Sequence, residues 1–283
     1  MKTAIYTFFQ YILPHRFLSK IVHKIMRIEN RKFKNFVIKK IIKAYNVNLS
    51  EAISENIDDY KHFNAFFTRQ LKPEARTVDK ANDSLISPVD GAISQCGKIT
   101  DGRIFQAKGF DYTVKELLAC GDEKAKLFTD GEFATIYLSP KDYHRMHAPI
   151  DCDVKKTVHV PGRLFSVANW TAESIPRLFA RNERLVCYLQ TEIGEIAFVL
   201  VGAIFVSSME TVFNGVVTPP YAKKVQEVPL NENTKLQKGD ELGRFNMGST
   251  VIMLFPKNSI SFEKELKAGQ TVQFGEKIAT ILK

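Results

Sequence analysis

Three short stretches of the sequence hold residues that could carry chemistry. The stretch "SPVDG" contains Asp90, "LSPKDYHRMHAP" contains His144 and His147, and "FNMGSTVIMLFP" contains Gly248 and Ser249. A carboxylate, an imidazole and a hydroxyl form the minimum set for an activated serine, in which the imidazole takes the hydroxyl proton. The residue types therefore indicate a candidate Asp–His–Ser site, if the fold brings the three stretches together.

Each stretch also has an ordinary structural interpretation. Asp-Gly is a common turn dipeptide, so Asp90 alone is read first as a turn residue. The spacing of His144 and His147 is compatible with a metal site, but no Cys, His or carboxylate cluster nearby completes one. General acid–base chemistry and two solvated loop histidines both stay open. Ser249 lacks the G-x-S-x-G pattern of one hydrolase class, and its triplet also reads as a tight turn before a buried strand.

The positive charge of the chain is concentrated at its N-terminus. The formal net charge is +9, whereas residues 1–45 alone hold eleven Lys or Arg and one acid, a net of +10. Apolar residues recur there at helical spacing beside rows of bases, first after Pro14 and again from Phe33 to Lys43. Such aromatic-rich stripes fit an anionic membrane surface better than nucleic acid, and packing on the main body is the alternative. We predict membrane-associating helices over 1–47 and a main domain over 48–283.

The rest of the chain predicts an α+β fold. Residues 48–80 are expected to form a further helical stretch with a polar connector. From residue 84, β-branched and aromatic runs alternate with Pro, Gly and Asp turns, and "EIGEIA" at 192–197 predicts a hairpin. Helices are expected at "YTVKELLA" and "AESIPRLFARNE", and no run approaches the roughly 18 apolar residues of a spanning helix. The expected architecture is a mainly antiparallel β body with an N-terminal basic amphipathic helical segment.

Seven stretches, in order from about residue 60 to the C-terminus, together resemble bacterial phosphatidylserine decarboxylases. They are "FNAFFTRQLKPEAR", "SPVDG", "YLSPKDYHRMHAP", "PGRLFSV", "LFARNERLVCYL", "VGAIFVSSMET" and "KGDELGRFNMGSTVIMLFP". Two places depart from the family pattern: Met247 stands where a leucine usually precedes the triplet, and the loop "SVANW" at 166–170 differs. Because Leu and Met are both apolar and similar in size, we expect Met247 to change the processing rate at most.

The resemblance implies an enzyme that processes its own chain. Ser249 would attack the carbonyl of Gly248, the chain would be cut there, and residue 249 would become an N-terminal pyruvoyl group. The products would be a β chain, 1–248, and an α chain, 249–283. In this resemblance His147 is the base and Asp90 orients it, and the missing Cβ of Gly248 permits the close approach of the hydroxyl.

The implied reaction is the decarboxylation of phosphatidylserine to phosphatidylethanolamine, a step of phospholipid biosynthesis. Loss of CO₂ leaves a carbanion that needs an electron sink, and the pyruvoyl group, joined to the substrate amine as a Schiff base, supplies it without metal or pyridoxal phosphate. His144 is the implied proton donor. The resemblance also implies a homodimer bound peripherally to the cytoplasmic face of the cell membrane. A serine hydrolase and a non-catalytic membrane-binding protein are the rivals, and both predict an uncut chain.

Overall fold

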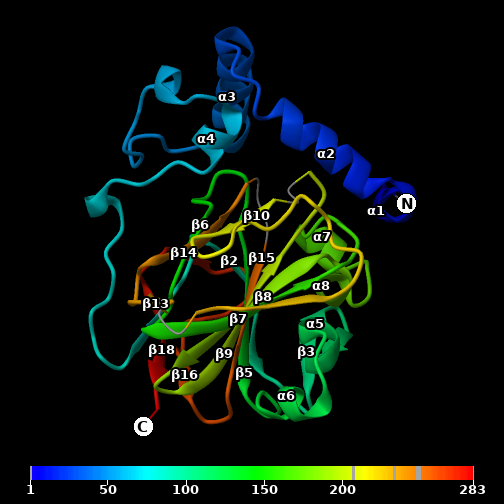
Figure 1. Ribbon diagram of the computed structural model, residues 1–283, viewed down its shortest axis with the longest axis vertical. Helices are drawn as coiled ribbons and strands as arrows, with labels where there is room; N and C mark the ends of the chain where they lie inside the picture. Colours follow the sequence, from blue (N-terminus) through cyan, green and yellow to red (C-terminus); the bar gives the residue numbers. More distant parts are fainter. Residues whose placement is uncertain (1, 206–207, 232–233, 247–249, 283) are drawn as a thin grey trace.

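The computed structural model describes residues 2–205, 208–231, 234–246 and 250–282 of the chain. Four helices lie in its N-terminal part, and Figure 1 shows α3 and α4 standing above the β body while α2 and α1 run away from them to the N-terminus. Their bounds are α1 (Lys2–Ile12), α2 (His15–Ile25), α3 (Arg31–Tyr45) and α4 (Phe63–Phe67). Individual residues explain where some of these helices begin and end. Pro14 interrupts the helical pattern between α1 and α2, and the Asn30 side chain caps α3 by accepting from the amide of Phe33 at 3.0 Å.

The prediction of a helical stretch over 48–80 is wrong for most of that segment. It contains only α4 and the 3₁₀ turns Ile57–Asp59 and Pro73–Ala75. Its backbone amides donate instead to carbonyl groups far away in the sequence: that of Lys72 to Glu51, and that of Asp79 to Gly275. In Figure 1 the chain after α4 descends along the side of the β body, so it acts as a connector.

A nine-stranded sheet, all of whose pairings are antiparallel, forms the centre of the described molecule. Its order is β12-β7-β8-β9-β15-β5-β2-β17, with β13 also paired to β7. The bounds are β12 (Gln226–Pro229), β7 (Cys152–Val160), β8 (Arg184–Thr191), β9 (Gly194–Val201), β15 (Thr250–Phe255), β5 (Glu132–Tyr137), β2 (Gly91–Lys98), β17 (Thr271–Val272) and β13 (Lys235–Leu236). The predicted hairpin is confirmed, because β8 pairs with β9 across it, with Thr191 opposite Gly194.

Three small sheets complete the β body. The first, β11-β10-β14-β6, and the second, β1-β18-β16, lie against the large sheet, and β3 pairs with β4. The bounds are β11 (Gly215–Val216), β10 (Met209–Thr211), β14 (Glu241–Phe245), β6 (Arg145–His147), β1 (Ser84–Ile86), β18 (Lys277–Ile281), β16 (Ile260–Phe262), β3 (Arg103–Ala107) and β4 (Phe110–Thr113).

Four short helices, α5 (Val114–Leu118), α6 (Asp122–Lys126), α7 (Asn169–Ala172) and α8 (Leu178–Arg181), lie along one side of the large sheet (Figure 1). A capping box between Thr113 and Glu116 starts α5, which confirms the helix expected there. The second expected helix, over 172–183, is reduced to the end of α7 and to α8. Pro176 lies between them and cannot continue a helix.

Both faces of the large sheet are covered by apolar packing. In β15, Val251, Met253 and Phe255 enter the cluster shared with the small sheets, while Ile252 and Leu254 enter the cluster shared with α5 and α8. All six residues of β15 are buried, as a continuous apolar run predicts. The α+β fold class with a mainly antiparallel body is therefore confirmed.

A third apolar cluster ties the N-terminal helices to the following chain. Ile38 of α3 packs with Tyr60, Phe63 and Phe66, so the cluster includes residues from both sides of the boundary expected after residue 47. That boundary stays a prediction. In the part of the chain that the structure describes, no helix is both long and apolar enough to cross a bilayer.

Candidate active site

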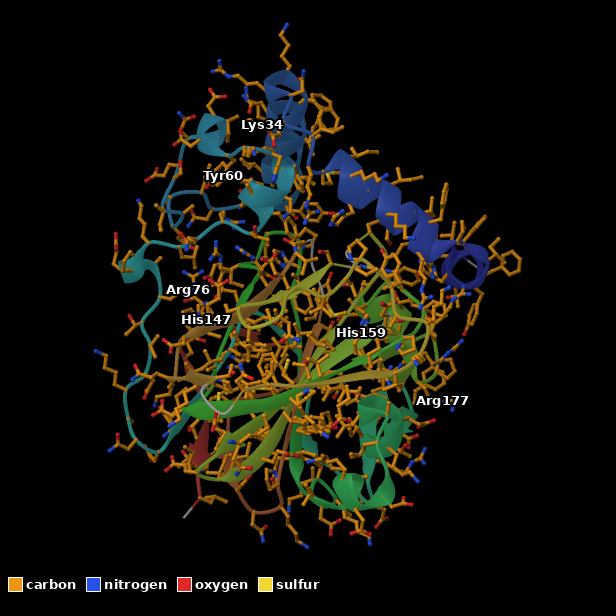
Figure 2. All side chains as sticks on the ribbon, in the orientation of Figure 1. Lys34, Tyr60, Arg76, His147, His159 and Arg177 are labelled. Carbon is orange, nitrogen blue, oxygen red and sulfur yellow. The ribbon has the colours of Figure 1, made fainter. Side chains whose placement is uncertain are left out.

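The two candidate histidines lie at opposite ends of a short edge pairing. The amide of Phe245, the last residue of β14, donates to the carbonyl of His144 at 3.0 Å, whereas His147 lies opposite Glu241 at the beginning of β14. Since the chain continues from Phe245 toward Gly248, His144 is the histidine nearer to that segment in the pairing. Figure 2 shows His147 and Arg76 on one side of the body, below α4, with His159 on the other side.

His144 is completely buried. Its ring stacks on Phe67 with centroids 4.0 Å apart, and neither ring nitrogen has a hydrogen-bond partner among the described residues. Burial, with a smaller contribution from the charge of Arg69, lowers the pKa of His144 to about 3. The imidazole is therefore neutral at pH 7.

His147 is held in one tautomer. Its Nδ1 lies 2.7 Å from the carbonyl oxygen of Gly239, which can only accept, so Nδ1 carries the proton in the neutral ring. The other nitrogen, Nε2, then accepts from the hydroxyl of Tyr143 at 3.1 Å. The ring also stacks on Phe274 with centroids 3.7 Å apart. Burial lowers the pKa of His147, which leaves Nε2 unprotonated near neutral pH and suited to take up a proton.

Asp90 lies in the turn before β2 and is also buried. Its carboxylate accepts from Nε and Nη2 of Arg76, with Nε at 3.0 Å, and from the backbone amide of Phe274 at 2.8 Å. The other carboxylate on the same guanidinium is Glu51, at 2.9 Å. Asp90 is thus the acceptor of a buried ion pair as well as a turn residue.

The expected direct contact between Asp90 and His147 is not present in the structure. Nδ1 of His147, the nitrogen that such a carboxylate would orient, donates to Gly239 instead, because that carbonyl lies within hydrogen-bond distance. The connection between the two residues runs through Phe274, whose amide binds Asp90 and whose ring covers His147. The roles of Asp90 and His147 remain proposals.

Met247, Gly248 and Ser249 lie outside the described residues. The residues on either side of them, Asn246 and Thr250, are held by hydrogen bonds and by strand pairing. The side chain of Asn246 accepts from Asn64 of the N-terminal region at 2.8 Å and donates to Ser208 at 3.0 Å. On the other side, Thr250 is buried between Tyr137 and Val201 in the large sheet. In the sequence, residues 247–249 therefore join β14, an inner strand of the four-stranded sheet, to β15, a central strand of the nine-stranded sheet.

A cavity of about 670 Å³ lies near the described start of β15. Its lining includes Tyr137, which lies opposite Thr250, together with Tyr143, Asp90 and Arg69. Within the described ranges, no group of three or more His, Cys, Asp or Glu side chains is placed to hold a metal ion.

Five residues of this site received no role from the sequence: Arg69, Arg76, Tyr143, Gly239 and Phe274. Arg69 and Arg76 lie in the "FNAFFTRQLKPEAR" stretch, and Tyr143 lies beside His144. Because these stretches resemble family motifs, the three residues could have been predicted as site residues from the sequence. Gly239 contributes a backbone carbonyl, and Phe274 contributes an amide and a ring from a segment outside those motifs. Neither contribution has a sequence signature.

The site thus contains two buried imidazoles, His144 and His147, whose pKa values are lowered by burial, and such groups could transfer protons. A family model described as "Phosphatidylserine decarboxylase" matches residues 63–280, and a second, described as "PSD", matches residues 5–46. The "Phosphatidylserine decarboxylase proenzyme" of Pseudomonas entomophila is 49% identical over 283 residues, covering 99% of this chain and 98% of that protein. The protein of the same name from Idiomarina loihiensis is 47% identical over 278 residues, covering 97% and 95%. The chain belongs to the phosphatidylserine decarboxylase family.

Proposed function

We propose that this chain is a proenzyme that cuts itself between Gly248 and Ser249 and then decarboxylates phosphatidylserine to phosphatidylethanolamine. Similarity over nearly the full length to proenzymes named for this substrate supports the reaction. The position of β15 supports the cut. This strand begins at Thr250, directly after Ser249, in the interior of the largest sheet, and every one of its residues is buried.

A fragment beginning at Ser249 would keep its place after the cut. Within the 35 residues of 249–283, β15 pairs with β5 and β9, β17 pairs with β2, and β18 pairs with β1. All of these partner strands belong to residues 1–248. Because four pairings of three strands hold the fragment, the new end at residue 249 would stay next to Thr250 in the sheet.

The residues around this end fit the proposed chemistry. We assign His147 as the base for the cut, with the Tyr143 hydroxyl on Nε2 in position to pass the proton, and Asp90 as a residue that positions His147 through Phe274. The pyruvoyl group formed from Ser249 would be held at the start of β15, where it supplies the carbonyl that accepts the electrons left by departing CO₂.

We assign His144 as the proton donor in the decarboxylation. An imidazole can both hold and release a proton, and this ring is fixed in place by its stacking on Phe67. Because its pKa of about 3 leaves the imidazole neutral in the free protein, this role requires that His144 take up a proton together with the substrate.

The N-terminal helices support peripheral membrane binding. Large apolar side chains of α1, α2 and α3 are exposed, including Phe8 at 61%, Phe17 at 63% and Phe36 at 61%. Together with the net charge of +10, they suit an anionic leaflet, to which each base near the surface contributes roughly 1 kcal/mol. We propose that the protein binds the cytoplasmic face of the cell membrane in this way, as a homodimer.

An ion pair fastens this helical segment to the body. Nη2 of Arg16 lies 3.2 Å from the buried carboxylate of Glu183 and donates to the carbonyl of Gly162 at 3.1 Å. Glu183 also accepts from His159 at 2.8 Å if that ring nitrogen is protonated. This anchor would keep the lipid-facing helices and the β body in one arrangement when α2 lies on a membrane.

Intact-mass measurement and a decarboxylation assay test the proposal. Wild type should give two chains, the smaller of 35 residues with a pyruvoyl end, whereas Ser249→Ala should stay a single inactive 32.2 kDa species. Ser261→Ala, an exposed serine in the same fragment, is the matched control and should be cut normally. A wild-type chain that stays uncut yet hydrolyses esters would favour a serine hydrolase. An uncut and inactive chain that binds vesicles would favour a non-catalytic protein.

A further inference from the structure

Exposed aromatic side chains of the β body lie beside the N-terminal helices. The stretch 166–170, which departs from the family pattern, ends in Trp170, the only tryptophan of the chain. Trp170 is 37% exposed, and its ring centroid lies 6.2 Å from that of Tyr6 in α1, which is 60% exposed. Phe205 is 45% exposed, and its amide donates to Oγ of Ser19 in α2 at 3.1 Å. Trp170 therefore flanks α1, and Phe205 flanks α2.

Hydrogen bonds fix α1 to the stretch that carries Trp170. The backbone amide of Ser166 donates to Oε1 of Gln10 at 2.9 Å, and Nη2 of Arg163 donates to the carbonyl of Tyr11 at 2.6 Å. Since Ser166 and Trp170 belong to the same short stretch, α1 and Trp170 keep one arrangement. A surface that receives the exposed aromatic side chains of α1 therefore meets Trp170 as well.

The charges around these aromatic side chains suit an anionic partner. Three bases of α2 and of the neighbouring body segment are exposed: Lys20, Lys24 and Arg163. The two nearby acids are already paired, Glu173 with Lys108 at 2.7 Å and Glu183 with Arg16 at 3.2 Å. Tryptophan and tyrosine rings suit the boundary between lipid tails and headgroups, and bases beside them meet the lipid phosphates. The chemistry of this surface therefore matches an anionic leaflet.

We propose that Trp170 and Phe205 enter the headgroup region of an anionic leaflet together with α1 and α2, so that the β body itself contacts lipid. This inference rests on the peripheral membrane binding proposed above and adds an orientation to it. Binding through the helices alone leaves open which side of the body faces the membrane. Contact through Trp170 and Phe205 turns the side that carries α7 toward the leaflet.

A second copy of the chain is the other occupant that an exposed apolar surface could have. In a two-fold dimer the same patch lies on both partners, so the exposed bases of one copy would face those of the other. Like charges brought together in an interface oppose association. The positive charge of this surface therefore favours the anionic leaflet.

The single tryptophan makes the wild-type chain its own reporter. The full chain is mixed with vesicles of phosphatidylcholine and phosphatidylglycerol, an anionic lipid that lacks the amine of phosphatidylserine. The fluorescence of Trp170 should shift to shorter wavelength as its ring leaves water. Phospholipids brominated near the upper end of the acyl chain should quench this fluorescence. Vesicles of phosphatidylcholine alone should produce neither change, because they offer no net negative charge.

A relocated tryptophan is the matched control. Leu127 is 48% exposed and follows α6, which lies at the end of the body opposite the N-terminal helices in Figure 1. In the double variant Trp170→Phe, Leu127→Trp, the fluorescence should be neither shifted nor quenched, although the protein still sediments with anionic vesicles. This result would show that the lipid reaches position 170 and not the whole surface of the body.

Sedimentation with the same vesicles measures how much the two side chains contribute. Trp170→Glu and Phe205→Glu should each weaken binding by roughly 10-fold, because each loses apolar contact and adds a negative charge. Trp170→Phe, which stays aromatic, should lose less. Leu127→Glu, the same kind of change at the opposite end, should bind like wild type. All four positions of change are exposed, so the unfolding temperature should stay that of wild type.

Three results would overturn the proposal. One is a wild-type chain that binds anionic vesicles with no shift and no quenching of Trp170. Another is wild-type binding by both glutamate variants. The third is loss of self-association in Trp170→Glu, seen by analytical ultracentrifugation, with unchanged vesicle binding, which would assign the surface to a second copy. A wild-type chain that binds no anionic vesicles would refute peripheral membrane binding itself, whereas the cut and the decarboxylation are measured separately.

Discussion

Replacing Asp90 with asparagine removes one negative charge from the buried pair with Arg76. The exposed fractions of the two side chains are 9% and 8%, so little solvent reaches either group. The carboxylate also accepts the amide of Phe274, whose ring covers His147. The change therefore perturbs both the stability of the protein and the setting of the proposed base.

The structure sets the size of the stability effect. Removing one partner of a buried ion pair costs about 3–5 kcal/mol when the other charge is left uncompensated. Here Arg76 keeps Glu51 at 2.9 Å, and an asparagine oxygen can still accept from Phe274. We therefore expect roughly half of the upper value, about 2.5 kcal/mol. A neutral oxygen is a weaker acceptor than a carboxylate, so the Phe274 amide, and with it the ring over His147, should be held less firmly. The cut should therefore slow, by up to the roughly 100-fold that is the lower range for a positioned base.

Two measurements separate these effects. Urea unfolding is compared in a Ser249→Ala background, in which neither protein is cut, and the cut is followed by intact mass in chains that retain Ser249. Glu51→Gln is the matched control, since it removes the other, more exposed carboxylate on Arg76 and should leave the cut unaffected. Cutting of Asp90→Asn at the wild-type rate, or an equal block in Glu51→Gln, would refute the reasoning.

Four further changes test the remaining assignments. His144→Ala should be cut yet lose at least about 100-fold in decarboxylation, and normal turnover would remove it from the mechanism. The pKa of His144 is about 3 in the folded protein and 6.5 ordinarily, so the unfolded chain takes up the proton first as the pH falls. The free energy of unfolding should therefore decrease between pH 6.5 and pH 3. His144→Phe should reduce this decrease, which urea unfolding at pH 7 and pH 5 would measure. Tyr143→Phe removes the donor that favours neutral His147, so the acid limb of the rate of cutting should move to higher pH, and an unmoved limb would contradict the contact. Deleting residues 1–45 should abolish binding to anionic vesicles, with neutral vesicles as the comparison, and retained binding would contradict the membrane proposal.

The sequence predicted those parts of the fold in which local residues decide the structure. The run from Thr250 to Phe255 is apolar at every position after the first, and a strand buried on both faces requires such a run. Pro14 and the Thr113 cap likewise act on their own helices. The helix prediction for residues 48–80 was wrong because the backbone hydrogen bonds of this segment are non-local. The amide of Asp79 donates to Gly275, and no residue within the segment indicates that partner.

The same distinction applies to the site. Residue types and turn positions indicated Asp90, His144 and His147 as candidates. The groups that orient Asp90 and His147, however, belong to residues far away in the sequence. Phe274 lies 184 residues from Asp90, and Gly239 contributes a carbonyl that any residue type would offer. A direct Asp–His contact was the natural expectation from residue types alone, whereas the actual link depends on the tertiary fold.

Phe274 also explains how one site could serve two reactions in succession. It belongs to residues 249–283, the fragment released in the proposed cut, yet its amide binds Asp90 and its ring binds His147 in residues 1–248. The pairing of β17 with β2 ends at Val272, two residues before it, and that pairing does not involve the cut bond. Cutting the chain at residue 249 therefore removes one covalent link but none of the contacts that place the base. The proposed cut would create a reactive end inside an arrangement that is already complete before the cut.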